Sequence, residues 1–114
     1  MVARIPRLRC AVLCTSDGFN LCSIGLTEDQ VGKMAALSSS LLSVGEAVVS
    51  TLVPENTGSG GLDIMTMEAN GIQLVGTRIH RSGGYLILMA AANAPLGLVL
   101  VGVKATADEV RVLL

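Results

Sequence analysis

Residues 10–25 read CAVLCTSDGFNLCSIG, and this stretch decides how the fold begins. Two largely apolar segments, Cys10 to Ser16 and Phe19 to Gly25, lie on either side of the dipeptide Asp17-Gly18. Asp-Gly readily adopts the positive φ angles of a type I′ turn, which joins two antiparallel strands with the correct twist. The stretch therefore predicts a β-hairpin.

A long helix is expected directly after this hairpin. Thr27 can cap free backbone N–H groups, Gln30 can reach back to Thr27, and the acidic pair Glu28-Asp29 favours a helix N-terminus. Apolar residues then recur at intervals of three, four and seven, until Pro54 ends the pattern. The residues expected to form the core-facing side of this helix are Val31, Met34, Leu41, Leu42, Val48, Val49 and Leu52.

Two more hairpins are expected in the second half of the chain. The segments Leu62–Ala69 and Ile72–Ile79 flank Asn70-Gly71, a second strong turn signal. A turn over residues 81–84 then leads into residues 85–92, which are apolar at consecutive positions. Such a run is typical of a central strand that is covered on both faces.

The tail of the chain predicts a second helix. Residues 96–114 carry one apolar stripe at helical spacing, with charged residues on the other side. The β-branched run Leu98 to Val103 leaves one alternative open, a strand followed by a shorter helix that Thr106 caps. The complete order predicts an α/β fold over residues 1–114, with a short N-terminal segment over residues 1–9. Its sheet is five-stranded and mostly antiparallel, with a long helix after strand 2 and a C-terminal helix.

Composition argues against several classes of partner. Tyr85 and Phe19 are the only aromatic residues, and the chain has eight basic and nine acidic side chains. The chain therefore lacks both a base-stacking surface and a positive electrostatic footprint, so nucleic acid is not an expected partner. The uncharged run Ser82 to Val103 is long enough to span a bilayer, but Asn93-Ala94-Pro95 divides it into a strand and a helix. Membrane insertion is therefore not expected.

The cysteines do not indicate a metal or redox site. Their number is three, and an odd number argues against a full set of disulfides and favours a reducing, cytoplasmic location. On a strand, Cys10 and Cys14 would lie about 13 Å apart, too far to bridge or to chelate one metal. We expect no metal and no cofactor.

The remaining polar residues do not form a recognisable catalytic motif. Ser38, Ser39 and Ser40 lie inside the predicted helix, without the Gly-x-Ser-x-Gly elbow that exposes a nucleophile. His80 is the only histidine, and Asp63 offers a carboxylate. The glycine-rich run over residues 58–61 lacks the Lys-Ser or Lys-Thr and the following helix of a phosphate-binding loop. We therefore expect no catalytic residue.

A stripe of small residues on the long helix indicates a contact surface. Its members, spaced four and three apart, are Ala36, Ser40, Ser43, Ala47 and Ser50. An exposed helix face normally carries many charges, whereas Glu46 is the only charge between Met34 and Val53. We favour a close helix-on-helix contact, with a solvent face of small polar residues as the alternative.

Three segments together resemble a known family. They are AVLCTSDGF at residues 11–19, MAALSSSLL at residues 34–42 and NAPLGLV at residues 93–99. In this order and spacing they resemble the roadblock / dynein light-chain family, especially the bacterial MglB-type regulators of Ras-like GTPases. The family usually has another helix before the first strand, where this chain has only residues 1–9.

The resemblance implies a profilin- or longin-like α+β domain that forms a homodimer. In such a dimer the strand after the long helix pairs with its twin, and the two long helices pack together. The residues implied at the interface are Ala36, Ser40, Ser43, Ala47, Ser50, Asp63, Met65 and Met67. The implied function is that of a non-enzymatic regulator or scaffold that binds a small Ras-like GTPase and, in some members, stimulates its hydrolysis. The alternative is a small-molecule sensing or protein-interaction domain of PAS- or profilin-like shape, with no GTPase partner.

Overall fold

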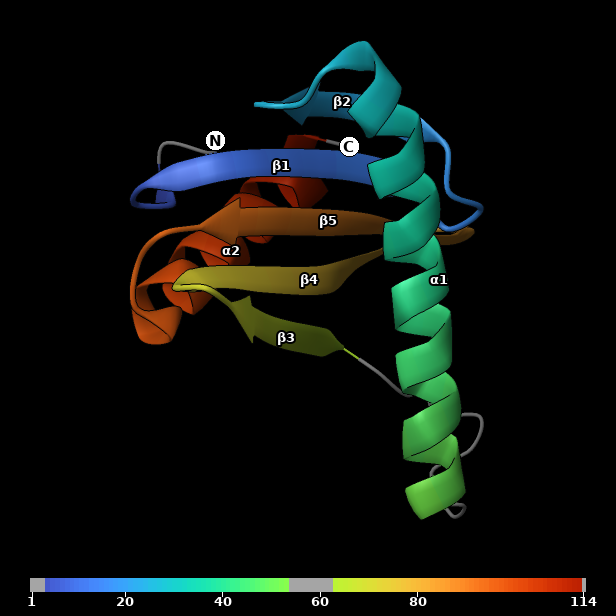
Figure 1. Ribbon diagram of the computed structural model, residues 1–114. Helices are drawn as coiled ribbons and strands as arrows, with labels where there is room; N and C mark the ends of the chain where they lie inside the picture. The colour runs from blue at the N-terminus through green and yellow to red at the C-terminus, as the bar shows by residue number, and fades with distance from the viewer. Residues whose placement is uncertain (1–3, 54–62, 114) are drawn as a thin grey trace.

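The protein is built around one antiparallel sheet with a helix on each face (Figure 1). The structure is a computed structural model that describes residues 4–53 and 63–113. Its strands lie in the order β2-β1-β5-β4-β3. The elements along the chain are β1 (Leu8–Thr15), β2 (Asn20–Ile24), α1 (Glu28–Leu52), β3 (Ile64–Ala69), β4 (Ile72–Arg81), β5 (Gly84–Ala92) and α2 (Leu96–Leu113). The predicted fold class and element order are confirmed.

The hairpin turns at Asn70-Gly71 and at Asp17-Gly18 differ in geometry. Asn70 and Gly71 have φ angles of 53° and 79°, so the turn between β3 and β4 has the positive angles expected of type I′. Between β1 and β2, Gly18 has a φ of 91° but Asp17 is not in the left-handed region, so the type I′ prediction is wrong there. The Gly18 N–H instead donates to the Thr15 carbonyl at 3.0 Å, and the longer loop needs only one left-handed residue.

Strand β5 lies at the centre of the sheet and is buried on both faces, as its continuous apolar run predicts. Leu88 and Ala90 pack beneath α2, together with residues such as Val103. Ile87 and Met89 point to the other face and pack with Leu42 of α1. The molecule therefore has two apolar layers, one between α1 and the sheet and the other between the sheet and α2.

Helix α1 begins as predicted but is less buried than predicted. Thr27 is its N-cap and forms a capping box with Gln30. Val48 and Leu52, which were expected to lie in the core, are 52% and 75% exposed. In Figure 1, α1 runs across the strands and its C-terminal end projects beyond β3.

The dimensions of the elements explain this projection. A helix of 25 residues is about 37 Å long, whereas the outer two of five strands are separated by only about 19 Å. A helix that crosses the strands from the β2 side must therefore leave the sheet before it ends. The expectation that Val48 and Leu52 are core residues fails because the sheet of one chain does not reach them.

The C-terminal tail forms one continuous helix, so the alternative of a strand over Leu98 to Val103 is wrong. The N–H groups of Leu98 and Val99 donate to the Pro95 carbonyl and start the helix. The uncharged run from Ser82 is accordingly divided between β5 and α2. By length and composition α1 could cross a membrane, a property that it shares with long core helices of soluble proteins.

Candidate interaction surface on the long helix and the edge strand

The small-residue stripe of α1 lies on the side of the helix that faces away from the core. Ala36, Ser40, Ser43 and Ala47 are exposed, and Ser50 is partly buried. The buried residues of the helix are Ala35, Ser38 and Leu42, which face the sheet. Within the described residues, the small-residue stripe is therefore available for contact with another molecule.

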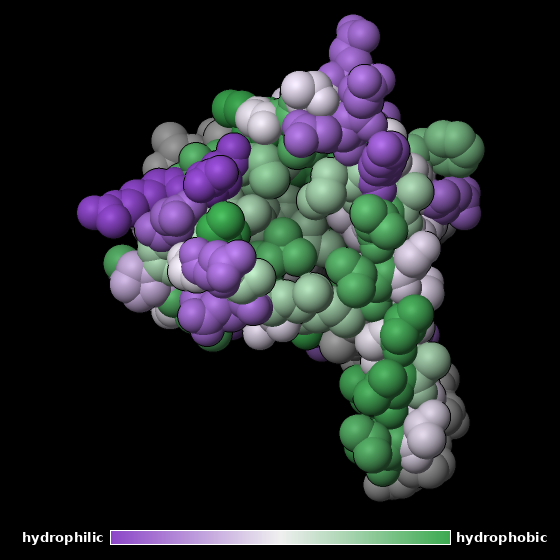
Figure 2. Space-filling view, viewed as in Figure 1, coloured by the Kyte–Doolittle hydropathy of each residue, from purple (hydrophilic) through white to green (hydrophobic). Residues whose placement is uncertain are grey.

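Large apolar side chains flank this stripe. Leu37, Val44 and Val48 are 57%, 62% and 52% exposed, and at 100° per residue they lie directly beside the small residues. Figure 2 shows apolar surface along α1, including the end that projects from the sheet. Sequence reasoning missed Leu37 and Val44 and assigned Val48 to the core, although their spacing of seven and four could have revealed the three as one face. We call the exposed residues Ala36, Leu37, Ser40, Ser43, Val44, Ala47 and Val48 the outer face of α1.

Strand β3 forms one edge of the sheet, next to the projecting end of α1 (Figure 1). Its pairing partner in the described chain is β4, so its outer N–H and C=O groups face away from the sheet. Met65 is partly buried against the layer beneath α1, and Met67, two residues later on the same face, is 47% exposed. The predicted residues Met65 and Met67 therefore lie on the face of the sheet that α1 occupies.

Asp63 lies immediately before β3 rather than within it. Its backbone carbonyl accepts hydrogen bonds from the Arg78 N–H at 3.2 Å and from the Thr77 hydroxyl at 3.1 Å. Its carboxylate lies 3.8 Å from Nε2 of His80. These contacts hold the start of β3 against β4. Leu62, the first residue of the predicted strand, and the glycine-rich run of residues 58–61 lie outside the described residues.

Of the three serines that could act as nucleophiles, two donate hydrogen bonds to backbone carbonyl groups and one is exposed to solvent. The Ser38 hydroxyl donates to the Met34 carbonyl at 2.6 Å, and the Ser39 hydroxyl donates to the Ser16 carbonyl at the same distance. Ser40 is exposed on the outer face of α1. Among the described residues, none of these hydroxyls is bonded to His80.

The cysteines are free thiols in three different environments. Cys14 is buried beneath α1, and burial raises its pKa to about 11, which favours the neutral thiol. Burial also raises the pKa of Cys10, whereas Cys22 is exposed on β2. Within residues 4–53 and 63–113, no three His, Cys, Asp or Glu side chains are grouped so that they could hold a metal ion.

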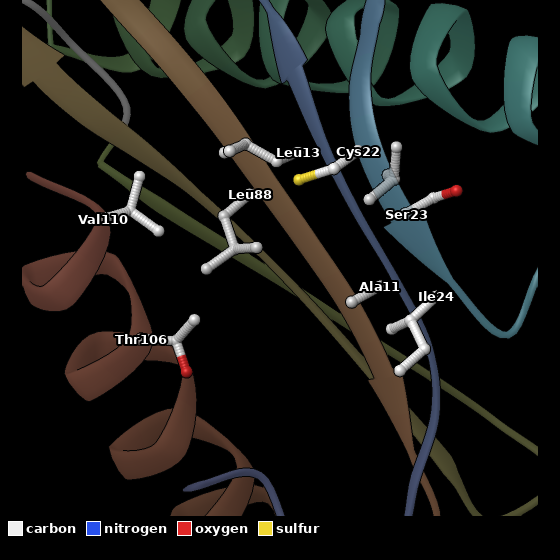
Figure 3. Close-up of a pocket in the computed structure, with 9 residues that line it drawn as sticks. Ala11, Leu13, Cys22, Ser23, Ile24, Leu88, Thr106 and Val110 are labelled. Atoms are coloured by element: carbon white, nitrogen blue, oxygen red, sulfur yellow. The ribbon is translucent and has the colours of Figure 1, made fainter. Parts of the chain in front are cut away.

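An apolar groove lies on the opposite side of the sheet, between strands β1 and β2 and helix α2 (Figure 3). Its volume is about 210 Å³. Leu13, Leu88 and Val110 point into it, and Ile24 of β2 lies at its outer side. Sequence reasoning missed this groove, because it depends on how much of the sheet α2 covers. Pattern analysis assigns each element a buried face but does not give the area that one helix covers.

Comparison with solved structures gives consistent matches. A roadblock/LC7 domain from Streptomyces avermitilis is 28% identical, with a TM-score of 0.73 over 96% of this chain and 88% of that chain. MglB of Myxococcus xanthus is 19% identical, with a TM-score of 0.76 over 98% of this chain and 80% of that chain. An MglB structure described as a tetrameric arrangement is 19% identical, with a TM-score of 0.77 over 96% of this chain and 79% of that chain. No protein-family model and no curated protein sequence matches the chain.

The sheet order, the two covering helices and these matches define the class of protein. The structure is that of a roadblock-type domain. Among roadblock structures it resembles MglB, so the resemblance in the sequence is confirmed at the level of fold.

Proposed function

We propose that this chain is a non-enzymatic, cytoplasmic, homodimeric regulator or scaffold that binds a small Ras-like GTPase. The observation that carries the proposal is the outer face of α1, which is apolar or small and lies next to an open strand edge. The likeness to roadblock and MglB structures supports the same assignment. The proposal treats residues 1–114 as one domain.

The position of α1 supports pairing with a second copy. If two chains joined their β3 edges about a two-fold axis, the sheet of each would continue into that of the other. The projecting end of α1 would then lie over the partner's sheet, which would cover Val48 and Leu52. The two α1 helices would lie close together, where Ala36, Ser40 and Ser43 permit a short interaxial distance.

The GTPase assignment rests on the family resemblance and is supported by the likeness to MglB structures. A paired platform would present two copies of each surface, so a single GTPase would meet both chains at once. By the family resemblance, any stimulation of hydrolysis would act by reshaping the active site of the GTPase.

Light scattering of the purified chain tests the proposal most directly. The mass should be twice 11.7 kDa, and it should rise by one GTPase molecule when a Ras-like GTPase loaded with a GTP analogue is added. The same GTPase loaded with GDP is the matched control and should bind more weakly. A monomer that ignores both forms would contradict the proposal.

One observation favours a second candidate function. The apolar groove between the β1–β2 hairpin and α2 has room for a small apolar molecule, as a sensing domain of PAS- or profilin-like shape would require. Calorimetry with a panel of apolar ligands distinguishes the two functions. Binding in the groove by a chain that is monomeric and does not bind the GTPase would favour the sensing function.

A further inference from the structure

A buried arginine connects the sheet to α1. Arg78 lies on β4, pairs with Ile87 of the central strand, and its side chain is only 3% exposed. Its guanidinium carbon lies 4.6 Å from the centre of the Tyr85 ring, and its Nη2 donates to the carboxylate of Glu46 on α1. One cation thus holds together two strands and a helix.

Glu46 occupies a particular position along α1. It is the only charged residue between Met34 and Val53. Leu42, one turn before it, is fully buried, whereas the next two residues, Ala47 and Val48, are exposed. Glu46 therefore contacts the sheet at the point where the helix begins to project.

Stability alone does not explain a charge pair at this position. The Arg78 side chain is 3% exposed and the Glu46 side chain 42% exposed, so the cost of desolvating the guanidinium offsets much of the attraction between the two charges. An apolar pair of similar size would therefore hold the helix about equally well. Apolar contacts are also non-directional and permit a helix to slide or pivot. A guanidinium is planar and can stack on an aromatic ring while it binds a carboxylate, so it permits few helix positions.

We propose that the Glu46–Arg78 ion pair fixes the direction in which the C-terminal end of α1 projects, and thereby selects the arrangement in which two copies of the chain pair. The inference rests on the proposed homodimer and assigns Glu46 and Arg78 as positioning residues for it. Tyr85 holds the guanidinium plane in place, and the outer face of α1 makes the contact with the second copy.

The test replaces the pair without leaving a buried charge unpaired. In the double variant Glu46→Leu/Arg78→Met, the side chains keep similar volume and lose both charges. We expect the thermal unfolding of this variant to remain close to that of the wild type, while the dimer dissociation constant measured by sedimentation rises roughly tenfold. Removal of the exposed Asp108–Arg111 pair of α2, in Asp108→Asn/Arg111→Gln, is the matched control and should leave the dissociation constant unchanged.

A distance measurement separates positioning from general weakening. A spin label at Thr51→Cys in a Cys22→Ser background reports the distance between the two α1 ends in the dimer. We expect one narrow distance with the ion pair present and a broad distribution in the double variant. A double variant with the same narrow distance and the same dissociation constant would overturn this inference alone. A wild-type chain that remains monomeric would overturn the proposed homodimer and this inference with it.

Discussion

Thr27 and Gln30 each hydrogen-bond the other's backbone at the start of α1: the Gln30 N–H donates to the Thr27 hydroxyl oxygen at 3.2 Å, and the Thr27 N–H donates to the Gln30 side-chain oxygen at 3.0 Å. Thr27→Ala should lower the free energy of unfolding by about 1 kcal/mol, because a helix N–H loses its partner. Urea unfolding of both single variants and of the double variant with Gln30→Ala checks the pair. Strict additivity of the two losses would contradict the reciprocal arrangement.

Leu42 and Val112 test which apolar residues contribute to the core. Leu42→Ala should cost about 2–5 kcal/mol, because the side chain is fully buried beneath α1 and its removal leaves a cavity. Val112→Ala should change stability by less than about 0.5 kcal/mol, because that side chain on α2 is 86% exposed. Equilibrium unfolding measures both. Similar losses would show that the two-layer description of the core is wrong.

Alanine substitutions at Gly25 and Gly71 distinguish the cost of backbone strain from the cost of a steric clash. Both have positive φ angles, 76° and 79°, so alanine at either position should cost about 1–2 kcal/mol in strain. A Cβ at Gly25 would also lie 2.2 Å from the Arg9 carbonyl oxygen, whereas a Cβ at Gly71 would meet nothing within 4 Å. Gly25→Ala should therefore be clearly more destabilising in urea unfolding. Equal losses would contradict the close approach of Arg9 to Gly25.

Cys14 should make stability depend on pH in the alkaline range. Burial raises the pKa of its thiol from an ordinary value of 9.0 to about 11 in the folded chain, so folding favours the neutral thiol. This contribution is fully present below about pH 9 and is lost as the pH rises toward about 11. Urea unfolding at pH 8, 9, 10 and 11 should show that loss, and Cys14→Ala should reduce it. A thiol reagent at pH 8 should modify the exposed Cys22 well before Cys14.

Ser43 tests the proposed dimer seam. Ser43→Arg should yield monomers, because a long charged side chain on the outer face of α1 would keep the two helices apart. Val101→Arg places the same side chain on an exposed position of α2 and should leave the dimer intact. Sedimentation at several concentrations distinguishes the two variants. A Ser43→Arg chain that still dimerises would place the seam elsewhere.

Local signals were sufficient for most of the fold. Asn70-Gly71 specifies a turn between two strands through its own backbone angles, and Thr27 with Gln30 specifies where α1 begins. The unbroken apolar run of residues 85–92 identified the central strand, because every side chain in it had to be buried. In each case, the residues that specify the structure lie within a few positions of the element that they specify.

The features that sequence analysis missed depend on residues far apart in the chain. Helical spacing marked Val48 and Leu52 as apolar partners, but it could not show that their own sheet ends before it reaches them. The ion pair between Glu46 and Arg78 joins residues 32 positions apart and has no signature in either segment. At the candidate surface, the small residues of α1 were identified, but the larger Leu37 and Val44 beside them were not.

Because α1 projects beyond the sheet, natural selection acts differently on substitutions in its two parts. Its N-terminal and central turns, around Met34 and Leu42, must fit the interior of a single chain, so harmful substitutions there should lower the stability of that chain at any concentration. Its last two turns project beyond the sheet, where they are exposed to contact with another molecule. Substitutions at Val48 or Leu52 should therefore leave an isolated chain intact and act through mass action, as a shift in the concentration at which chains assemble. Assembly could then change during evolution, with a new partner or a weaker one, while the fold stays the same.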